Sequence, residues 1–243
     1  MEKINPLESM AKLSPNTENT QNMINCSVCA KEIKENESLY QVDKDDLCSD
    51  CIKIYSKNEE NKRLLKLGLS KHHLTMGFDN YKIDHKNKNA TIAFGEYVEN
   101  GGTKGLYLHG KCGNGKTHLA VSLFKEISQS DNKCRFITTP ELLLEIREAF
   151  NNKSDVSEKE LIDRYSGYNY LFLDDFGAEK ASEWSIQTIY LILDRAIRNE
   201  KHLIITSNHN LSEISKTLGD RIASRITELC KIVKIDSDDM RGK

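Results

Sequence analysis

A glycine-rich stretch, GLYLHGKCGNGKTH at residues 105–118, contains the first side chains that could do chemistry. Gly110, Gly115, Lys116 and Thr117 complete the pattern G-x-x-x-x-G-K-[ST]. Glycines let the backbone turn sharply and point N–H groups at phosphate oxygens. Lys116 would reach the β- and γ-phosphates of a nucleotide, and the Thr117 hydroxyl would hold Mg²⁺. The residues expected to surround ATP or ADP are Gly110, Lys111, Cys112, Gly113, Asn114, Gly115, Lys116, Thr117 and His118.

Two adjacent carboxylates follow an apolar run in YLFLDDFG, where residues 170–173 deliver Asp174 and Asp175. We expect Asp174 to share the Mg²⁺ with Thr117, and Asp175 to act as the base that polarises the attacking water. Aspartates are also common in turns. Their position one strand after the phosphate loop favours the catalytic interpretation. Because aspartate is one methylene shorter than glutamate, we expect slow hydrolysis.

Three further polar positions could contact the phosphates or the water. Asn208 ends the apolar run LIITSN and could orient the water, although an asparagine there is more often a cap or turn residue. Arg221 and Arg225 lie four apart and share one helical face. They form either a solvated basic face or an arginine finger offered to a neighbouring subunit. Arg241, near the end of the chain, is a third candidate cation.

Four cysteines form a second site of a different kind. Cys26 and Cys29 make one C-x-x-C, and Cys48 and Cys51 make another, with eighteen residues between them. This spacing predicts a four-thiolate zinc site whose closed shell leaves no catalytic position. The intervening segment has few apolar residues and could hardly fold without the metal. A redox pair is disfavoured because no βαβ pattern surrounds either motif. Such a module could dock on a protein or on nucleic acid.

The elements that must position these residues alternate between strand-like and helix-like runs. Strands are predicted at residues 105–109, 134–138, 170–174, 202–206 and 231–235. Helices are predicted at residues 117–128, 140–150 and 183–199. Thr139 before Pro140 indicates a helix cap. This alternation predicts an α/β fold, a five-stranded parallel sheet with helices on both faces.

Composition divides the chain into four parts. We assign residues 1–22 to a mobile tail, 23–57 to the zinc module, 58–77 to a linker and 78–243 to the ATPase domain. The last predicted strand lies close to the end of the sequence, so we expect no full helical lid. The net charge of −2 gives no global basic field for nucleic acid. The sequence contains no apolar run of about eighteen residues, so no membrane span is predicted. The polar N-terminal stretch indicates a cytoplasmic protein.

Taken in order and spacing, GKCGNGKTHLA, YLFLDDFGAEKASEW, LIITSN and LGDRIASRI resemble the DnaC/DnaI class of bacterial or phage replicative helicase loaders. These are AAA+ ATPases of the initiator clade. The resemblance spans roughly residues 78–241. It implies Walker A contacts at Lys116 and Thr117, a Walker B pair at Asp174 and Asp175, and sensor 1 at Asn208. It further implies a finger at Arg225, with Arg221 second, and a sensor-2 role for Arg241.

The resemblance implies an ATP-dependent loader of a DnaB-type ring helicase onto single-stranded DNA, which assembles with itself when ATP is bound. IstB-type transposition helper ATPases share the same motifs and stay an alternative. A nucleotide-gated adaptor with negligible hydrolysis is a third possibility. DNA contacts would come from the helical stretch after residue 137. The candidates there are Thr138, Thr139, Arg147, Phe150, Lys153 and Arg164, most of which are expected to serve capping, packing or solvation.

Overall fold

The computed structural model describes residues 24–33, 40–42, 45–100, 102, 104–131, 133–150, 156–178 and 181–239. Arg241, Lys153 and the predicted tail at residues 1–22 lie outside the described residues. The chain forms two compact units, which divide between Lys66 and Leu67. No helix among the described residues is both long and apolar enough to cross a membrane.

The first unit carries the cysteines on two small antiparallel hairpins followed by a helix. Its elements are β1 (Ile24–Asn25), β2 (Glu32–Ile33), β3 (Tyr40–Val42), β4 (Asp45–Leu47) and α1 (Ser49–Lys66). β1 pairs with β2, and β3 pairs with β4. The buried residues of this unit are few, and three of its core members are cysteines. The unit therefore offers little apolar burial of its own to stabilise it.

The second unit is built on a parallel sheet whose strand order is β6-β7-β8-β5-β9. The strands are β5 (Gly105–His109), β6 (Cys134–Thr138), β7 (Tyr170–Phe176), β8 (His202–Ser207) and β9 (Cys230–Lys234). Each strand lies within a residue or two of its predicted limits. The predicted five-stranded parallel fold is therefore confirmed.

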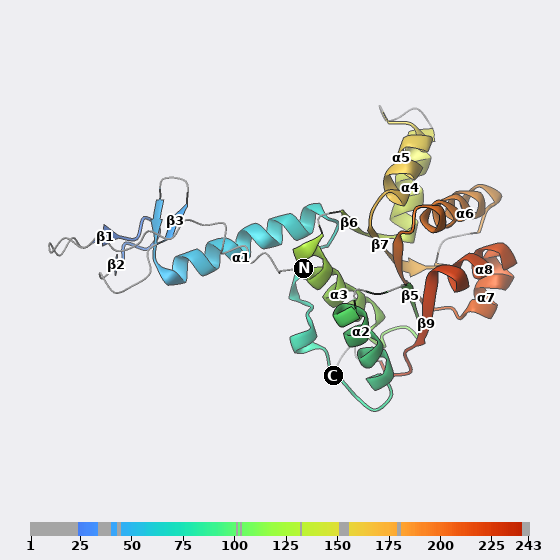
Figure 1. The fold of residues 1–243 in the computed structure, drawn as a ribbon, viewed down its shortest axis with the longest axis horizontal. Helices are drawn as coiled ribbons and strands as arrows, with labels where there is room; N and C mark the ends of the chain where they lie inside the picture. The colour runs from blue at the N-terminus through green and yellow to red at the C-terminus, as the bar shows by residue number, and fades with distance from the viewer. Residues whose placement is uncertain are drawn as a thin grey trace. The chain divides into compact units, whose positions relative to one another are not determined.

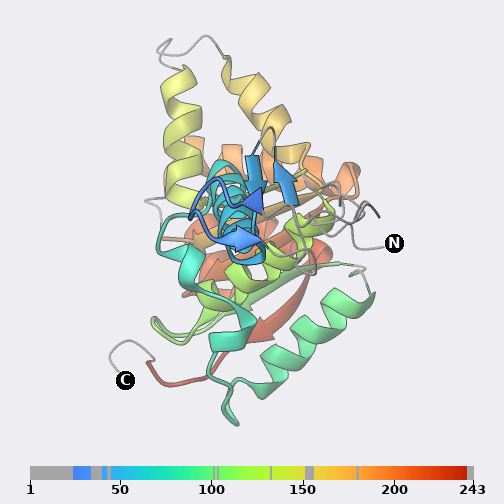
Figure 2. The same cartoon turned by 90° about the vertical axis from the view of Figure 1, so that its left-hand side faces the viewer.

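Helices cover both faces of this sheet (Figure 1). They are α2 (Lys88–Asn100), α3 (Lys116–Ser130), α4 (Thr139–Phe150), α5 (Glu158–Ser166), α6 (Glu183–Arg198), α7 (Leu211–Leu218) and α8 (Asp220–Leu229). α3 packs on β6, β7 and β8, with α2 beside it, while α4 and α8 contact the sheet from the other side. α4 and α5 stand side by side (Figure 2, yellow-green and yellow).

Alternate side chains of the strands feed two apolar layers. Phe136 and Phe172 pack with Phe124 of α3 on one face, with ring centroids 5.0–6.0 Å apart. Tyr107 and Leu173 belong to the larger cluster formed with α4 to α8. Burial on both faces explains why the strands read as apolar runs without polar alternation.

The helix α2 was not predicted. Its sequence KNATIAFGEYVEN contains asparagine and glycine, which are weak helix formers. Its buried residues are nevertheless Ala90, Ala93, Phe94 and Tyr97, which follow the i, i+3, i+4, i+7 pattern of one helical face. Tertiary packing of that face outweighs the weak local propensity.

The stretch assigned to a linker, residues 58–77, has a defined structure. α1 extends to Lys66, and residues 67–81 then form a strap that is part of the second unit. Leu67 accepts a hydrogen bond from the Phe136 amide at 3.0 Å. Gly68 has φ of 110°, and a Cβ there would lie 1.9 Å from the Phe136 carbonyl oxygen, so this close approach requires glycine.

Two side chains of α3 fasten the strap. Lys125 Nζ donates to the carbonyls of Leu74 (2.8 Å) and Met76. His118 Nε2 lies 2.9 Å from the Gly77 oxygen. The strap is therefore bound to the same helix that starts at the glycine-rich loop. The charged and polar sequence of this stretch indicates a linker. Its contacts to α3 join residues far apart in the sequence, so the sequence alone does not indicate them.

Candidate nucleotide site and metal centre

The glycine-rich loop joins β5 to α3, as predicted. Gly113 and Gly115 have φ of 79° and 89°, in the left-handed region. A Cβ on Gly115 would lie 2.8 Å from the ring of Tyr81, and one on Gly113 would lie 2.1 Å from Asp239 Oδ1. The backbone conformation favours glycine at both positions, and at Gly115 the Tyr81 ring adds a close neighbour. α3 begins at Lys116, so its N-terminal N–H groups and the positive end of its dipole face any bound anion.

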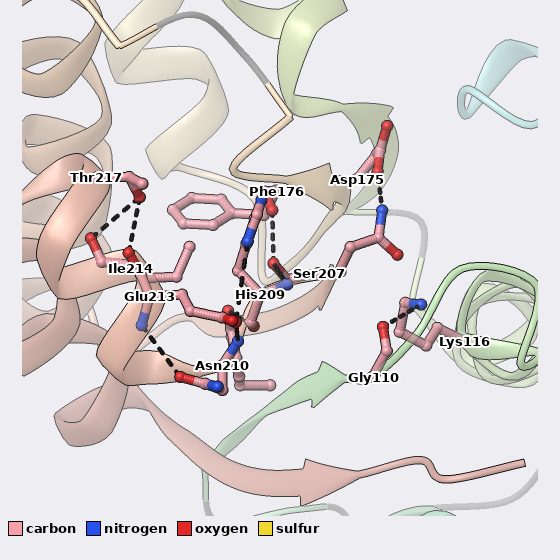
Figure 3. Close-up of polar contacts among 12 residues, drawn as sticks. Gly110, Lys116, Asp175, Phe176, Ser207, His209, Asn210, Glu213, Ile214 and Thr217 are labelled. Carbon is pink, nitrogen blue, oxygen red and sulfur yellow. Dashed lines mark hydrogen bonds and ion pairs between the residues drawn. The ribbon is translucent and has the colours of Figure 1, made fainter.

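Lys116 is held against its own loop. Its ammonium group donates to the carbonyls of Gly110 (2.9 Å) and Lys111 (2.7 Å) and to Asn114 Oδ1 (3.1 Å). Figure 3 shows its bond to Gly110. The side chain is 7% exposed. The cation thus lies inside the loop, where a phosphate group would need it.

Asp174 forms the centre of a small polar cluster at the tip of β7. Thr117 Oγ1 donates to its Oδ1 at 2.9 Å, and Thr206 Oγ1 donates to the same oxygen at 2.5 Å. The structure therefore brings together Thr117 and Asp174, the two predicted Mg²⁺ ligands. Burial raises the pKa of Asp174, while the two threonine hydrogen bonds act in the opposite direction. A buried carboxylate in this setting favours a neighbouring cation.

Asp175 adopts a φ of 55°, which is unusual for a residue other than glycine. The register between β7 and β8 shifts between Leu173 and Phe176, so neighbouring carboxylates can point in different directions. Asp175 is exposed, and Asn208 Nδ2 donates to its Oδ1 at 3.2 Å. The predicted base and the predicted water-orienting residue are therefore in contact.

The loop that carries Asn208 is fixed by its neighbours. Ser207 Oγ donates to the Phe176 carbonyl at 2.6 Å and accepts from the His209 amide at 3.0 Å (Figure 3). Tyr107 donates to the His209 carbonyl at 2.7 Å. These bonds tie the ends of β7 and β8 together, which holds Asn208 beside Asp175.

Sequence reasoning missed three neighbours of this site. Thr206 bridges the two carboxylate residues, because it also accepts a bond from the Asp175 amide at 3.0 Å. The sequence signal that could have indicated Thr206 is its position as a polar residue at the end of the apolar run LIIT. Tyr81 packs against the loop from the strap, and Asp239 from the segment after β9. Nothing in the local sequence indicates either contact.

The two candidate arginines lie on α8 in different settings. Arg225 contacts Asp194 at 3.1 Å and Glu228 at 2.8 Å, and its guanidinium lies over the Tyr190 ring. The Arg221 side chain is exposed, and it makes no ion pair within the described part of the chain. The choice between them as the finger stays a prediction.

The cap of α4 differs from the prediction. Glu141 N donates to Thr138 Oγ1 at 3.3 Å, and Thr138 Oγ1 also binds the Glu141 carboxylate at 2.8 Å. Thr139 is buried, and its hydroxyl lies 3.4 Å from the Asp174 carbonyl. The cap is therefore Thr138, because Thr139 turns inward to the end of β7. Among the other DNA candidates, Arg147 stacks on the Trp184 ring at 4.7 Å, and Arg164 is exposed.

The residues present fit a magnesium nucleotide. Gly113 and Gly115 have no side chains that would cover the backbone N–H groups of the loop, and Lys116 lies in the same loop. Thr117 and Asp174 place a hydroxyl and a carboxylate 2.9 Å apart, oxygen ligands of the kind Mg²⁺ prefers. These residues would hold Mg²⁺, which would supply charge stabilisation at the β- and γ-phosphate oxygens.

The four predicted zinc ligands come together in the first unit. Cys26 and Cys29 flank the turn after β1, Cys48 follows β4, and Cys51 lies in the first turn of α1. Their four sulfur atoms all lie within 4.8 Å of one another. The Cys48 amide donates to Cys26 Sγ at 3.4 Å. Backbone hydrogen bonds, first from Cys48 and then from Cys29, lower the pKa of Cys26 to about 6, which favours the thiolate that binds metal.

This geometry fits zinc. Four thiolates at a Zn–S distance of about 2.3 Å in a tetrahedron lie about 3.8 Å apart. Cys29 and Cys48 place their sulfur atoms 3.8 Å apart. The cluster could therefore hold a metal with little rearrangement. A tetrahedral four-sulfur donor set is typical of zinc or iron, and the identity of the metal stays a prediction.

The parallel sheet, the glycine-rich loop and the acids at the tip of β7 define a nucleotide-binding domain of the AAA+ type. The family model of IstB-like ATP binding proteins matches residues 52–243. The chain belongs to this family.

Comparison with curated proteins and solved structures agrees with this assignment. The chain is 28% identical over 162 residues to the replicative helicase loader DnaC of Escherichia coli K12, covering 65% of this chain and 66% of that protein. It thus spans just under two thirds of that relative. DnaI of Bacillus subtilis is 26% identical over 60% of this chain and 50% of its own length. A crystal structure of the DnaC helicase loader superposes with a TM-score of 0.61 at 27% identity, over 68% of this chain and 99% of that one.

Proposed function

We propose that this protein is an ATP-dependent loader that places a replicative ring helicase on single-stranded DNA. The observation that carries the proposal is the contact set of Thr117, Asp174, Asp175 and Asn208, within a region whose relatives are named replicative helicase loaders. The reaction is ATP hydrolysis, and its useful product is a change of conformation. The helicase, the DNA and the ATP-dependent self-assembly are all part of this proposal.

In the proposed reaction each residue has one task. Lys116 and the loop amides bind the phosphates, and Thr117 and Asp174 hold Mg²⁺ in place. Asp175 accepts hydrogen bonding from the attacking water and takes its proton, while Asn208 orients that water. Thr206 is a positioning residue, because its hydroxyl bonds both Asp174 and the Asp175 amide. A short aspartate as base is consistent with slow turnover.

A second candidate of the same chemistry is an IstB-type transposition helper, because the matching family is that of IstB-like ATP binding proteins. Loading is tested directly by measuring how much replicative helicase becomes bound to closed circular single-stranded DNA, with and without ATP. We expect this protein to raise that amount, and Lys116→Ala to raise it far less. If only a transposase is recruited to DNA with ATP, the transposition function is correct instead. Equal loading with and without this protein would rule out the loader.

Two substitutions at the nucleotide site should affect ATP binding and ATP hydrolysis separately. Lys116→Ala removes the charge-assisted bond to phosphate, so ATP affinity should fall about 10- to 100-fold. Asp175→Asn keeps Asp174 for Mg²⁺ and removes the base, so ATP should bind normally while turnover falls about 10²- to 10⁴-fold. Equilibrium binding of a fluorescent ATP analogue and phosphate release check the two effects. Wild-type turnover in Asp175→Asn would mean that another group acts as base.

A further inference from the structure

Arg225 lies on a seat formed by two residues of α6. Tyr190 and Asp194 are four residues apart, so they lie on the same face of that helix. Asp194 Oδ1 is 3.1 Å from the guanidinium, the Tyr190 hydroxyl is 3.4 Å away, and the ring centroid is 5.8 Å away. The seat therefore contacts Arg225 by charge, by hydrogen bond and by ring face at once.

Asp194 has the properties of an anchor. Its side chain is only 9% exposed, and it pairs with both Arg225 and Arg198. A carboxylate removed from water in this way interacts more strongly with a cation than an exposed one does. Glu228, the other acid on Arg225, is half exposed and lies on the same helix, so it adds little. Asp194 thus fixes the direction of the Arg225 side chain.

Arg225 keeps an accessible edge while it is held. Its side chain is 31% exposed, and a guanidinium has five N–H donors, of which these contacts use only part. A cation that must meet a phosphate on another subunit loses less entropy if its direction is already set. A misplacement of about 1 Å can cost on the order of 10²-fold in rate.

We infer that Asp194 is a positioning residue, which with Tyr190 presents Arg225 to the ATP of a second copy of this chain. The inference rests on the proposed self-assembly and on the finger role that the sequence resemblance implies for Arg225. In this role Asp194 acts on the phosphate only through Arg225.

The test changes only the chain that donates Arg225 to the active site of another chain, which we call the donor. Arg225→Ala has an intact phosphate loop, and Lys116→Ala has an intact arginine, so their mixture hydrolyses ATP in trans. Adding Asp194→Asn to the Lys116→Ala chain should lower the rate of that mixture about 10-fold or more. Adding Asp163→Asn should leave the rate unchanged. That control breaks the 2.5 Å pair between Asp163 of α5 and Arg195 of α6, and neither residue forms an ion pair with Arg225.

Tyr190→Phe in the donor chain keeps the ring and removes the hydroxyl, so a smaller loss is expected. It also keeps the test valid if Asp194→Asn fails to fold, which thermal unfolding of each donor detects. If folded donors with and without Asp194→Asn give equal rates, Asp194 has no positioning role. If Asp194→Asn does not fold and Tyr190→Phe has no effect, the shared seat of Tyr190 and Asp194 does not position Arg225, and the inference fails. If Arg225→Ala alone hydrolyses ATP like the wild type, the trans arginine is wrong, and this inference is overturned with it.

Discussion

Arg225→Ala is expected to bind ATP as tightly as the wild type and to hydrolyse it about 10³-fold more slowly. An arginine supplied in trans stabilises charge in the transition state without contributing to ATP binding within its own subunit. Every contact of Arg225 within the described residues is to α6 or α8, so its removal leaves the phosphate loop intact. The measurement is phosphate release at saturating ATP, alongside equilibrium binding.

Mixing two variants tests whether Arg225 acts on the ATP of another subunit. At an ATP concentration that Lys116→Ala binds poorly, Arg225→Ala and Lys116→Ala should each hydrolyse ATP slowly, and together they should recover part of the wild-type rate. Wild-type activity per chain should also rise with protein concentration, or with single-stranded DNA that gathers subunits. Arg221→Ala is the control on the same helix, because its side chain is exposed. Activity per chain that stays flat with concentration, with no recovery on mixing, would show that each site works alone. A loss in Arg221→Ala only would reverse the order of the pair.

The second large effect is expected at the cysteine cluster. Purified protein should contain about one zinc per chain, and Cys48→Ser should lose the metal and unfold the first unit while ATP binding persists. Structural zinc sites contribute on the order of 10–16 kcal/mol of apparent binding energy, which exceeds what a unit with so few buried residues can replace.

Two signals separate the units in that experiment. Trp184, the single tryptophan of the chain, lies in α6, so its fluorescence follows the second unit. Zinc content and protease sensitivity follow the first. Cys112→Ser is the matched control, because it removes a thiol outside the cluster and should keep the zinc. Protein that contains no zinc and has four freely reactive thiols would contradict the prediction.

The strands and the phosphate loop could be predicted because local signals and tertiary structure agree there. Residues 170–173 form an apolar run that two acids follow, which is the pattern of a strand buried on both faces that delivers polar groups at its tip. α2 and Thr206 were missed for different reasons. The helix has weak propensity and depends on packing. Thr206 is a residue of β8, and its contacts with the two carboxylate residues depend on β7 lying beside β8.

The contacts of the strap and of Asp239 could not be predicted, because both join segments far apart in the sequence. Tyr81 lies more than thirty residues before Gly115, and Asp239 lies more than a hundred residues after Gly113. Neither contact follows a repeating pattern. The positions of Arg221 and Arg225 illustrate the same limit, since their spacing places them on one helical face but only the neighbouring α6 makes their surroundings different.

The strap has a practical consequence for dissecting the protein. Leu69 is almost fully buried, and the His73 ring packs on Phe136 at 5.2 Å. A fragment started at Phe78, where the α/β pattern becomes visible in the sequence, would remove both side chains and expose the apolar surface of β6 and α3. The compact second unit starts at Leu67, so domain exchange between relatives should join the chains before that residue.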